Sequence, residues 1–133
     1  MCIALFFITH ENIAESLLRV GEKIIQKQNI NLAYHEVTMD AGIEQTIAQV
    51  EKKLGQLNLK KGILFITDIY GSTPSNIAQT MADKYQAQLL SGVNLPMVIR
   101  LLNYRDIPED LILAKALDGA CKGIQHHTPE TGI

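Results

Sequence analysis

Two residues of this chain combine the chemistry of a nucleophile and its orienting base, although they lie far apart in the sequence. His10 follows the apolar segment 2–8, and Asp68 follows the apolar segment 62–67. A neutral imidazole can act as a nucleophile when one ring nitrogen exposes its lone pair and the other keeps the proton. A carboxylate that accepts a hydrogen bond from the protonated nitrogen fixes this tautomer and stabilises the charge that develops during attack. We therefore predict that His10 and Asp68 form a catalytic pair.

The turn that follows this aspartate suits an anion. Its residues are Gly71, Ser72 and Thr73, and Pro74 comes directly after them. Gly71 permits unusual backbone dihedral angles and a close approach to a ligand, and Pro74 suits the first turn of a helix. Ser72 and Thr73 offer hydroxyl and N–H groups at a helix N-terminus, where the helix dipole favours negative charge. The turn therefore predicts a phosphate-binding site formed by Gly71, Ser72 and Thr73.

Strand-like and helix-like segments alternate along the chain, and their order decides whether these residues can meet. Short apolar runs predict strands, and apolar residues at helical spacing predict helices. The strands are expected at 2–8, 31–37, 62–67 and 87–90, and the helices at 12–28, 43–54, 74–84, 94–102 and 106–121. Such alternation favours an α/β three-layer sandwich with a mostly parallel sheet, and right-handed crossovers make 2-1-3-4 the simplest order. The histidine, the aspartate and the turn then share the crevice at the carboxyl edge of the sheet.

Local patterns predict how individual helices begin and which sides they bury. Asn94 is expected to cap the fourth helix, and Asp106 the fifth, with Glu109 at capping-box spacing. The first helix is expected to bury one side that carries Ile13, Leu17, Leu18, Val20, Ile24 and Ile25.

Composition indicates one globular domain over residues 1–133, with 47% hydrophobic and 20% charged residues. The net charge is −2 and no run of Lys and Arg occurs, so we expect no nucleic-acid partner. The apolar start is too short for a membrane span and lacks a basic n-region. Cys2 and Cys121 form no CxxC pattern and suit reduced thiols. We therefore expect a cytoplasmic protein.

Other polar residues are weaker candidates. His35 ends the second predicted strand, where it either lines the same edge or, more simply, lies on the surface. His126 and His127 have poor spacing for metal ligands, and we expect no metal or other cofactor. Tyr70 either packs or contacts a partner, and we expect an apolar surface beside the histidine that includes Ile69 and Tyr70.

Three segments around the predicted site resemble a known family over nearly the whole chain: 8–10, 62–76 and 91–97. They are similar to the enzyme IIA component of the mannose family of the bacterial phosphoenolpyruvate-dependent sugar phosphotransferase system. The resemblance implies a phosphotransferase component whose His10 accepts a phosphoryl group on Nε2 while Asp68 binds Nδ1–H. Thr73 and Ser72 would hold the phosphoryl oxygens.

The resemblance also implies partners. The donor would be the phosphocarrier HPr and the acceptor a IIB component, in coupled sugar uptake and phosphorylation. The membrane would be reached only through IIC and IID components. Family members form homodimers that exchange an antiparallel strand near the C-terminus. Because the chain ends at Ile133 without a IIB domain, the acceptor is expected to be a separate polypeptide.

Two departures and several alternatives remain open at this point. Glu11 stands where family members often have Gly, and Ser72 stands where a second Gly is common. Glu11 either favours the helix start or repels an incoming phosphate, which leaves the transfer rate and the partner open.

The alternative functions are a regulatory IIA-like protein that senses phosphotransferase flux and an IIA-like phosphate donor to a dihydroxyacetone kinase. A hydrolase that uses His10 is less favoured, because no arginine or second acid–base group is apparent nearby.

Overall fold

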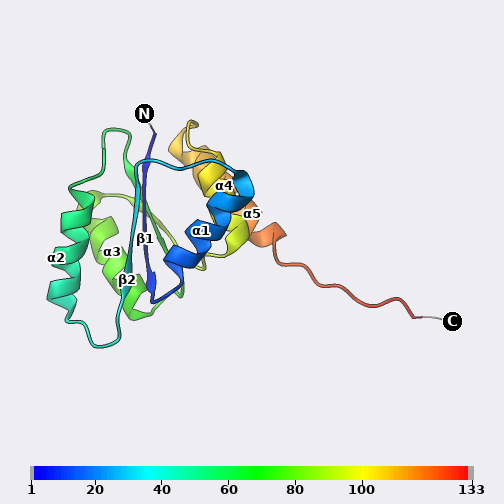
Figure 1. Cartoon of the computed structure of the whole chain (residues 1–133), viewed down its shortest axis with the longest axis horizontal. Coiled ribbons are helices and arrows are strands. Elements are labelled where there is room, and N and C mark those ends of the chain that lie inside the picture. The colour runs from blue at the N-terminus through cyan, green and yellow to red at the C-terminus, as the bar shows by residue number, and fades with distance from the viewer. Residues whose placement is uncertain (1, 132–133) are drawn as a thin grey trace.

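A four-stranded parallel sheet lies between two layers of helices in the computed structural model, which describes residues 2–131 (Figure 1). The strands are β1 Ala4–His10, β2 Leu32–Val37, β3 Ile63–Thr67 and β4 Gln88–Leu90. They lie in the order β2-β1-β3-β4, and each neighbouring pair is parallel. The predicted fold class and strand order are confirmed.

The helices cover both faces of this sheet (Figure 1). They are α1 Ala14–Ile25, α2 Ile43–Leu54, α3 Thr73–Tyr85, α4 Leu95–Asn103 and α5 Glu109–Lys122. Leu5 and Phe7 of β1 share one hydrophobic cluster with α1, α4 and α5, whereas Phe6 and Ile8 share the other with α2 and α3. Successive side chains of a strand point to opposite faces, so a central strand that is covered twice must be apolar throughout. A short run that is apolar throughout therefore predicts a strand of this kind.

The buried side of α1 differs from the prediction. Ala14, Leu18 and Gly21 are buried, whereas Ile13, Val20 and Ile24 are exposed; Leu17 and Ile25 pack at the margin of the core. A Cβ atom at Gly21 would lie 3.0 Å from Val98 Cγ1, so α1 approaches α4 closely at this glycine. That close approach rotates three of the larger apolar side chains away from the core.

One of the two predicted helix caps is confirmed and the other is wrong. The side chain of Asn94 accepts a hydrogen bond from the N–H of Met97 at 2.9 Å and caps α4. Asp106 does not cap α5, because this helix begins at Glu109 and has Pro108 at its cap position without a side-chain hydrogen bond. The residue before a proline is sterically kept out of the α region, so the helix cannot start at 106 or 107.

The segment after α5 contains no strand within the described part of the chain. Residues 123–131 have no regular secondary structure and extend away from the sheet and its helices (Figure 1). All strands within residues 2–131 are parallel, so the antiparallel strand expected from the resemblance remains a prediction. No helix among these residues combines the length and apolar character needed to cross a membrane.

Candidate functional site

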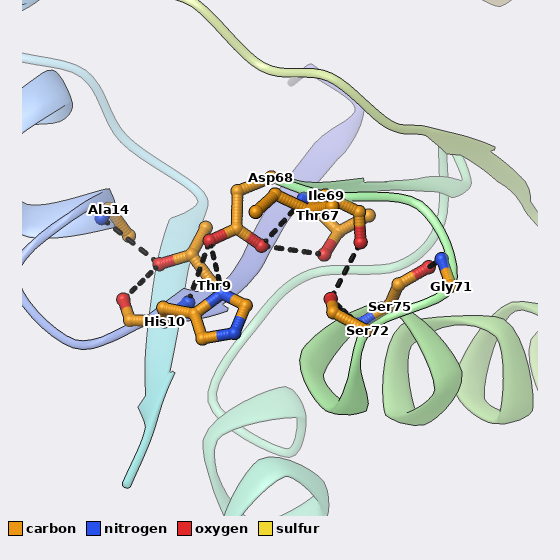
Figure 2. Close-up of polar contacts among 9 residues, drawn as sticks. All are labelled: Thr9, His10, Ala14, Thr67, Asp68, Ile69, Gly71, Ser72 and Ser75. Carbon is orange, nitrogen blue, oxygen red and sulfur yellow. Dashed lines mark hydrogen bonds and ion pairs between the residues drawn. The ribbon is translucent and has the colours of Figure 1, made fainter. Parts of the chain in front are cut away.

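The topology brings His10 and Asp68 into direct contact. His10 is the last residue of β1, and Asp68 follows the last residue of the neighbouring strand β3. The ring Nδ1 of His10 lies 2.7 Å from Asp68 Oδ2, and the backbone N–H of His10 donates to the same oxygen at 2.9 Å (Figure 2). One carboxylate oxygen therefore holds both the main chain and the ring of the histidine.

This contact decides which ring nitrogen is bound to Asp68 and which is free of it. An ionised carboxylate only accepts hydrogen bonds, so Nδ1 of His10 carries a proton, and in the neutral ring the lone pair then lies on Nε2. The ring points its Nε2 away from the aspartate (Figure 2). The His10 side chain is 42% exposed, whereas that of Asp68 is only 10% exposed. The imidazole is thus accessible from outside, while the carboxylate that orients it is shielded.

Asp68 is held in its ionised form by the donors around it. Burial alone would raise its pKa, but hydrogen bonds from the backbone N–H and ring of His10 and from the N–H of Ile69 outweigh burial. The pKa of Asp68 is therefore lower than that of an ordinary aspartate. The Ile69 N–H donates to Oδ1 at 2.9 Å, so each carboxylate oxygen has its own backbone donor.

Two buried threonines that the sequence analysis did not single out support this pair. The Thr9 hydroxyl donates to the carbonyl of His10 at 2.8 Å and accepts from the N–H of Ala14 at 3.1 Å, which joins the end of β1 to the start of α1. The Thr67 hydroxyl lies 3.5 Å from Asp68 Oδ1. Both threonines are fully buried. A polar residue at the end of an otherwise apolar strand was the available signal for them.

The loop after β4 fixes the main chain of Asp68 from the other side. The N–H of Gly92 donates to the Asp68 carbonyl at 2.7 Å, and the N–H of Val93 donates to the Thr67 carbonyl at 3.2 Å. Gly92 has φ +76°, a left-handed conformation that glycine adopts without strain. The third segment of the family resemblance therefore packs against the second.

In the predicted phosphate-binding turn, most donors are already used. The N–H of Gly71 donates to Ser75 Oγ at 3.2 Å, and Gly71 has φ +86°. The hydroxyl of Ser72 donates to the Ile69 carbonyl at 2.6 Å and accepts from the N–H of Ser75 at 3.4 Å. The N–H of Ser72 also donates to the Ile69 carbonyl. Gly71 thus shapes the turn, and Ser72 caps α3 (Figure 2).

Thr73 differs from these two neighbours. It is the first residue of α3 and is exposed, and its hydroxyl and N–H have no hydrogen-bond partner among residues 2–131. Two donors at a helix N-terminus are therefore available to an anion. Of the three predicted phosphate-binding residues, Thr73 has the groups that an oxyanion could use without breaking the turn.

The remaining histidines do not join this site. His35 is buried, which corrects the expectation of a surface residue. It pairs in register with Ile8, before the end of β2, and its Nδ1 lies 3.1 Å from Lys53 Nζ of α2. Burial, and then the charge of Lys53, lower the pKa of His35. His126 and His127 lie in the segment after α5, and no three metal-binding side chains cluster within the described residues.

The chain is similar to known phosphotransferase system proteins in sequence. A family model described as "EIIA-man: PTS system fructose IIA component" matches residues 4–111. The mannose-specific EIIAB component from Escherichia coli (strain K12) is 30% identical over 128 residues, which cover 94% of this chain and 39% of that protein. The fructose-specific EIIA component from Bacillus subtilis (strain 168) is 30% identical over 66 residues, or 49% of this chain and 45% of that protein. The chain thus spans less than half the length of these curated relatives.

Solved structures share the fold. The mannose/sorbose specific IIA subunit of the phosphotransferase system from Enterococcus faecalis has a TM-score of 0.84 at 23% identity, and the match covers 99% of this chain and 100% of that one. The component EIIA from Streptococcus agalactiae has a TM-score of 0.80 at 22% identity, covering 93% and 96%. At these identities the likeness establishes the fold and nothing more.

The environment of Asp68 predicts a pH-dependent contribution to stability. Because its pKa is lowered on folding, the carboxylate stabilises the protein above the ordinary pKa of about 4, and this stabilisation is lost as the pH falls through the lowered pKa. The Asp68→Asn variant should therefore unfold with a free energy about 2 kcal/mol below that of the wild type at about pH 7, with a smaller gap at about pH 3. Urea unfolding at both pH values measures this gap.

Asp40→Asn is the control, because Asp40 is exposed and forms no ion pair or side-chain hydrogen bond within the described residues. It should leave the free energy of unfolding nearly unchanged at both pH values. If the difference in free energy of unfolding between Asp68→Asn and the wild type is the same at both pH values, the lowered pKa of Asp68 is contradicted.

Proposed function

The chain belongs to the EIIA-man family and is a mannose-type IIA component of a phosphotransferase system, and we propose that it carries phosphoryl groups on Nε2 of His10. The observation that carries this proposal is the 2.7 Å contact between His10 Nδ1 and Asp68 Oδ2, which leaves Nε2 as the free nitrogen of a partly exposed ring. A neutral, oriented imidazole is the group that can accept a phosphoryl group and release it again.

The proposed reaction is an in-line transfer between two histidines. The lone pair of His10 Nε2 attacks the phosphorus of a phosphohistidine on the donor, and the P–N bond of the donor breaks as the new P–N bond forms. The bonding electron pair returns to the donor nitrogen. The proton on His10 Nδ1 stays in its hydrogen bond to Asp68, whose negative charge offsets the positive charge on the ring. Transfer to the acceptor is the same step in reverse.

The phosphoryl oxygens need donors during this transfer. Thr73 offers a hydroxyl and an N–H at the start of α3, and the helix dipole favours negative charge there. Gly71 and Ser72 support the same site by shaping the turn and capping the helix. Positioning and charge stabilisation are sufficient for phosphoryl transfer of this kind, without covalent participation of further residues.

We propose HPr as the donor and a IIB component as the acceptor. The name of the E. coli relative joins a IIA with a IIB component, which supports a IIB acceptor. The names of the relatives give mannose, fructose or mannose/sorbose, so we assign no sugar to this chain. We also propose that residues 1–133 form one cytoplasmic IIA domain that reaches the membrane only through IIC and IID components.

Substitution of His10 tests the proposal directly. The His10→Gln variant should take no phosphoryl label from phosphorylated HPr, because it lacks the attacking nitrogen. The control is His35→Gln, whose histidine is buried against Lys53 and away from the site. This control should still be labelled at the wild-type rate. Labelling of His10→Gln would show that another residue carries the phosphoryl group.

The turn predicts opposite effects for two neighbouring substitutions. Thr73→Val removes a hydroxyl without a partner in the described chain, so it should slow transfer from phosphorylated HPr by about tenfold or more with little change in stability. Ser72→Ala removes the cap of α3, so it should lower the free energy of unfolding by about 1 kcal/mol and slow transfer less. Quenched time courses of phosphoryl transfer measure the rates of both variants, and urea unfolding measures their free energies of unfolding. The reverse ranking in transfer rate would exclude Thr73 as the main oxygen-binding residue.

We further propose that the chain forms a homodimer in which the C-terminal segment of each subunit adds an antiparallel strand to the sheet of the other. Two features support this arrangement. β4 is an edge strand, and residues 123–131 extend away from their own sheet. Light scattering of the full chain should give twice the 14.8 kDa mass of one chain. A monomeric mass at micromolar concentration would contradict the dimer.

A further inference from the structure

Lys53 of α2 binds two acceptors on β2, which is an edge strand of the described sheet. Its Nζ atom donates to the carbonyl of Tyr34 at 2.9 Å and lies 3.1 Å from Nδ1 of the buried His35. An ammonium group only donates, so Nδ1 of His35 accepts from charged Lys53, and the neutral ring carries its own proton on Nε2. Lys53 therefore rests against a histidine nitrogen that can take up a proton.

The number of acceptors suits the uncharged form of this lysine. A charged lysine has three N–H groups, whereas a neutral lysine has two N–H groups and a lone pair. Tyr34 and His35 can bind both N–H groups of neutral Lys53 and leave its lone pair free. Burial also lowers the pKa of Lys53, and the charge of Glu36 offsets this effect only in part. A larger fraction of Lys53 is thus neutral at a given pH than of an exposed lysine.

Two clefts on the α2 side of β2 share Lys53. The first has a volume of about 450 Å³ and is lined by His35, Gln49, Lys52, Lys53 and Gln56. The second, of about 540 Å³, shares Lys53 and Gln56 with the first and continues along the start of β2. Among residues 2–131, no aspartate or glutamate lines either cleft. A cleft with lysines and amide groups but no carboxylate favours an anionic ligand.

The charged and titratable groups around Lys53 leave this cleft positive. Glu36 points to the opposite side of β2 from His35, because successive side chains of a strand alternate. Its carboxylate accepts a hydrogen bond from the Glu15 N–H of α1 at 3.0 Å. The ring of Tyr34 lies 5.8 Å from Lys53 Nζ, and Lys52 adds a second, exposed positive charge.

We propose that Lys53 is a modification site that accepts acyl groups from small acyl phosphates. The lone pair of Nζ attacks the carbonyl carbon, and the bond from this carbon to the phosphate oxygen breaks, with its electron pair leaving on the phosphate. His35 Nδ1 takes one proton from Nζ and passes it to the released phosphate. The products are an amide on Lys53 and hydrogen phosphate, and Lys52 attracts the phosphate group. This inference does not depend on phosphorylation of His10.

Acylation would change the free edge of the sheet. The amide has one N–H group where the amine had two, so either the Tyr34 carbonyl or His35 loses its donor. The positive charge of Lys53 is lost as well, and lysine charges protect edge strands from pairing with other chains.

Treatment of the full chain with acetyl phosphate tests the proposal, with the acetylated fraction of each lysine followed by peptide mass spectrometry. At about pH 7.5, Lys53 should react several-fold faster than Lys52, and the difference should shrink at about pH 10, where exposed lysines also lose protons. Lys52 is the internal control, because it is exposed and has no ion pair or side-chain hydrogen bond within the described residues. Equal rates for the two lysines at about pH 7.5 would overturn the proposal.

Two further comparisons test the acyl donor and the histidine. Acetic anhydride is uncharged, so the preference for Lys53 over Lys52 should be larger with acetyl phosphate; an equal preference would overturn the choice of acyl phosphates. The His35→Gln variant can still accept a hydrogen bond but cannot take up the proton. It should acetylate several-fold more slowly at Lys53 and at the wild-type rate at Lys52, and an unchanged rate at Lys53 would overturn the role of His35. The His10→Gln variant should react like the wild type at both lysines, so this test is separate from that of the proposed function.

Discussion

The hydrogen bond between Asp68 and His10 is the interaction on which the whole site depends, and the sheet register determines it. Ile8 of β1 pairs with Thr67 of β3, so Asp68 follows β3 at the level where β1 reaches His10. Oδ2 of Asp68 can then accept from the backbone N–H and the ring of His10 at once. A register shift of one residue would turn one of these side chains to the other face of the sheet and separate the pair.

The electrostatic balance at Asp68 explains why its carboxylate is charged at neutral pH and can orient the ring of His10. Burial by itself favours the protonated acid, which could no longer act solely as an acceptor for Nδ1–H. The backbone donors of His10 and Ile69 reverse this preference, and they belong to the two chain segments that leave the strands. The main chain therefore favours the charged form of the carboxylate. Thr9 and the loop containing Gly92 hold those main-chain segments in place.

Much of this arrangement could be predicted from the sequence, because central strands have an unambiguous signature. The apolar runs that became β1 and β3 are buried on both faces, and their order along the chain defined the edge where His10 and Asp68 meet. The roles of Ser72 and Thr73 could not be separated in the same way. Both have hydroxyls at the start of a helix, and only the observed hydrogen bonds show that Ser72 is used as a cap.

The remaining errors arose where tertiary packing decides between equivalent local patterns. Gly21 allows α1 to approach α4 closely, which leaves Ile13 exposed although its helical spacing fits a buried side. Because of Pro108, α5 begins at Glu109 and not at Asp106.

NMR of the phosphorylated protein with ¹⁵N-labelled histidine tests most directly whether His10 Nε2 carries the phosphoryl group. We expect phosphorus bound to Nε2 of His10 and a proton on Nδ1. Phosphorus on Nδ1, or on any other residue, would contradict it.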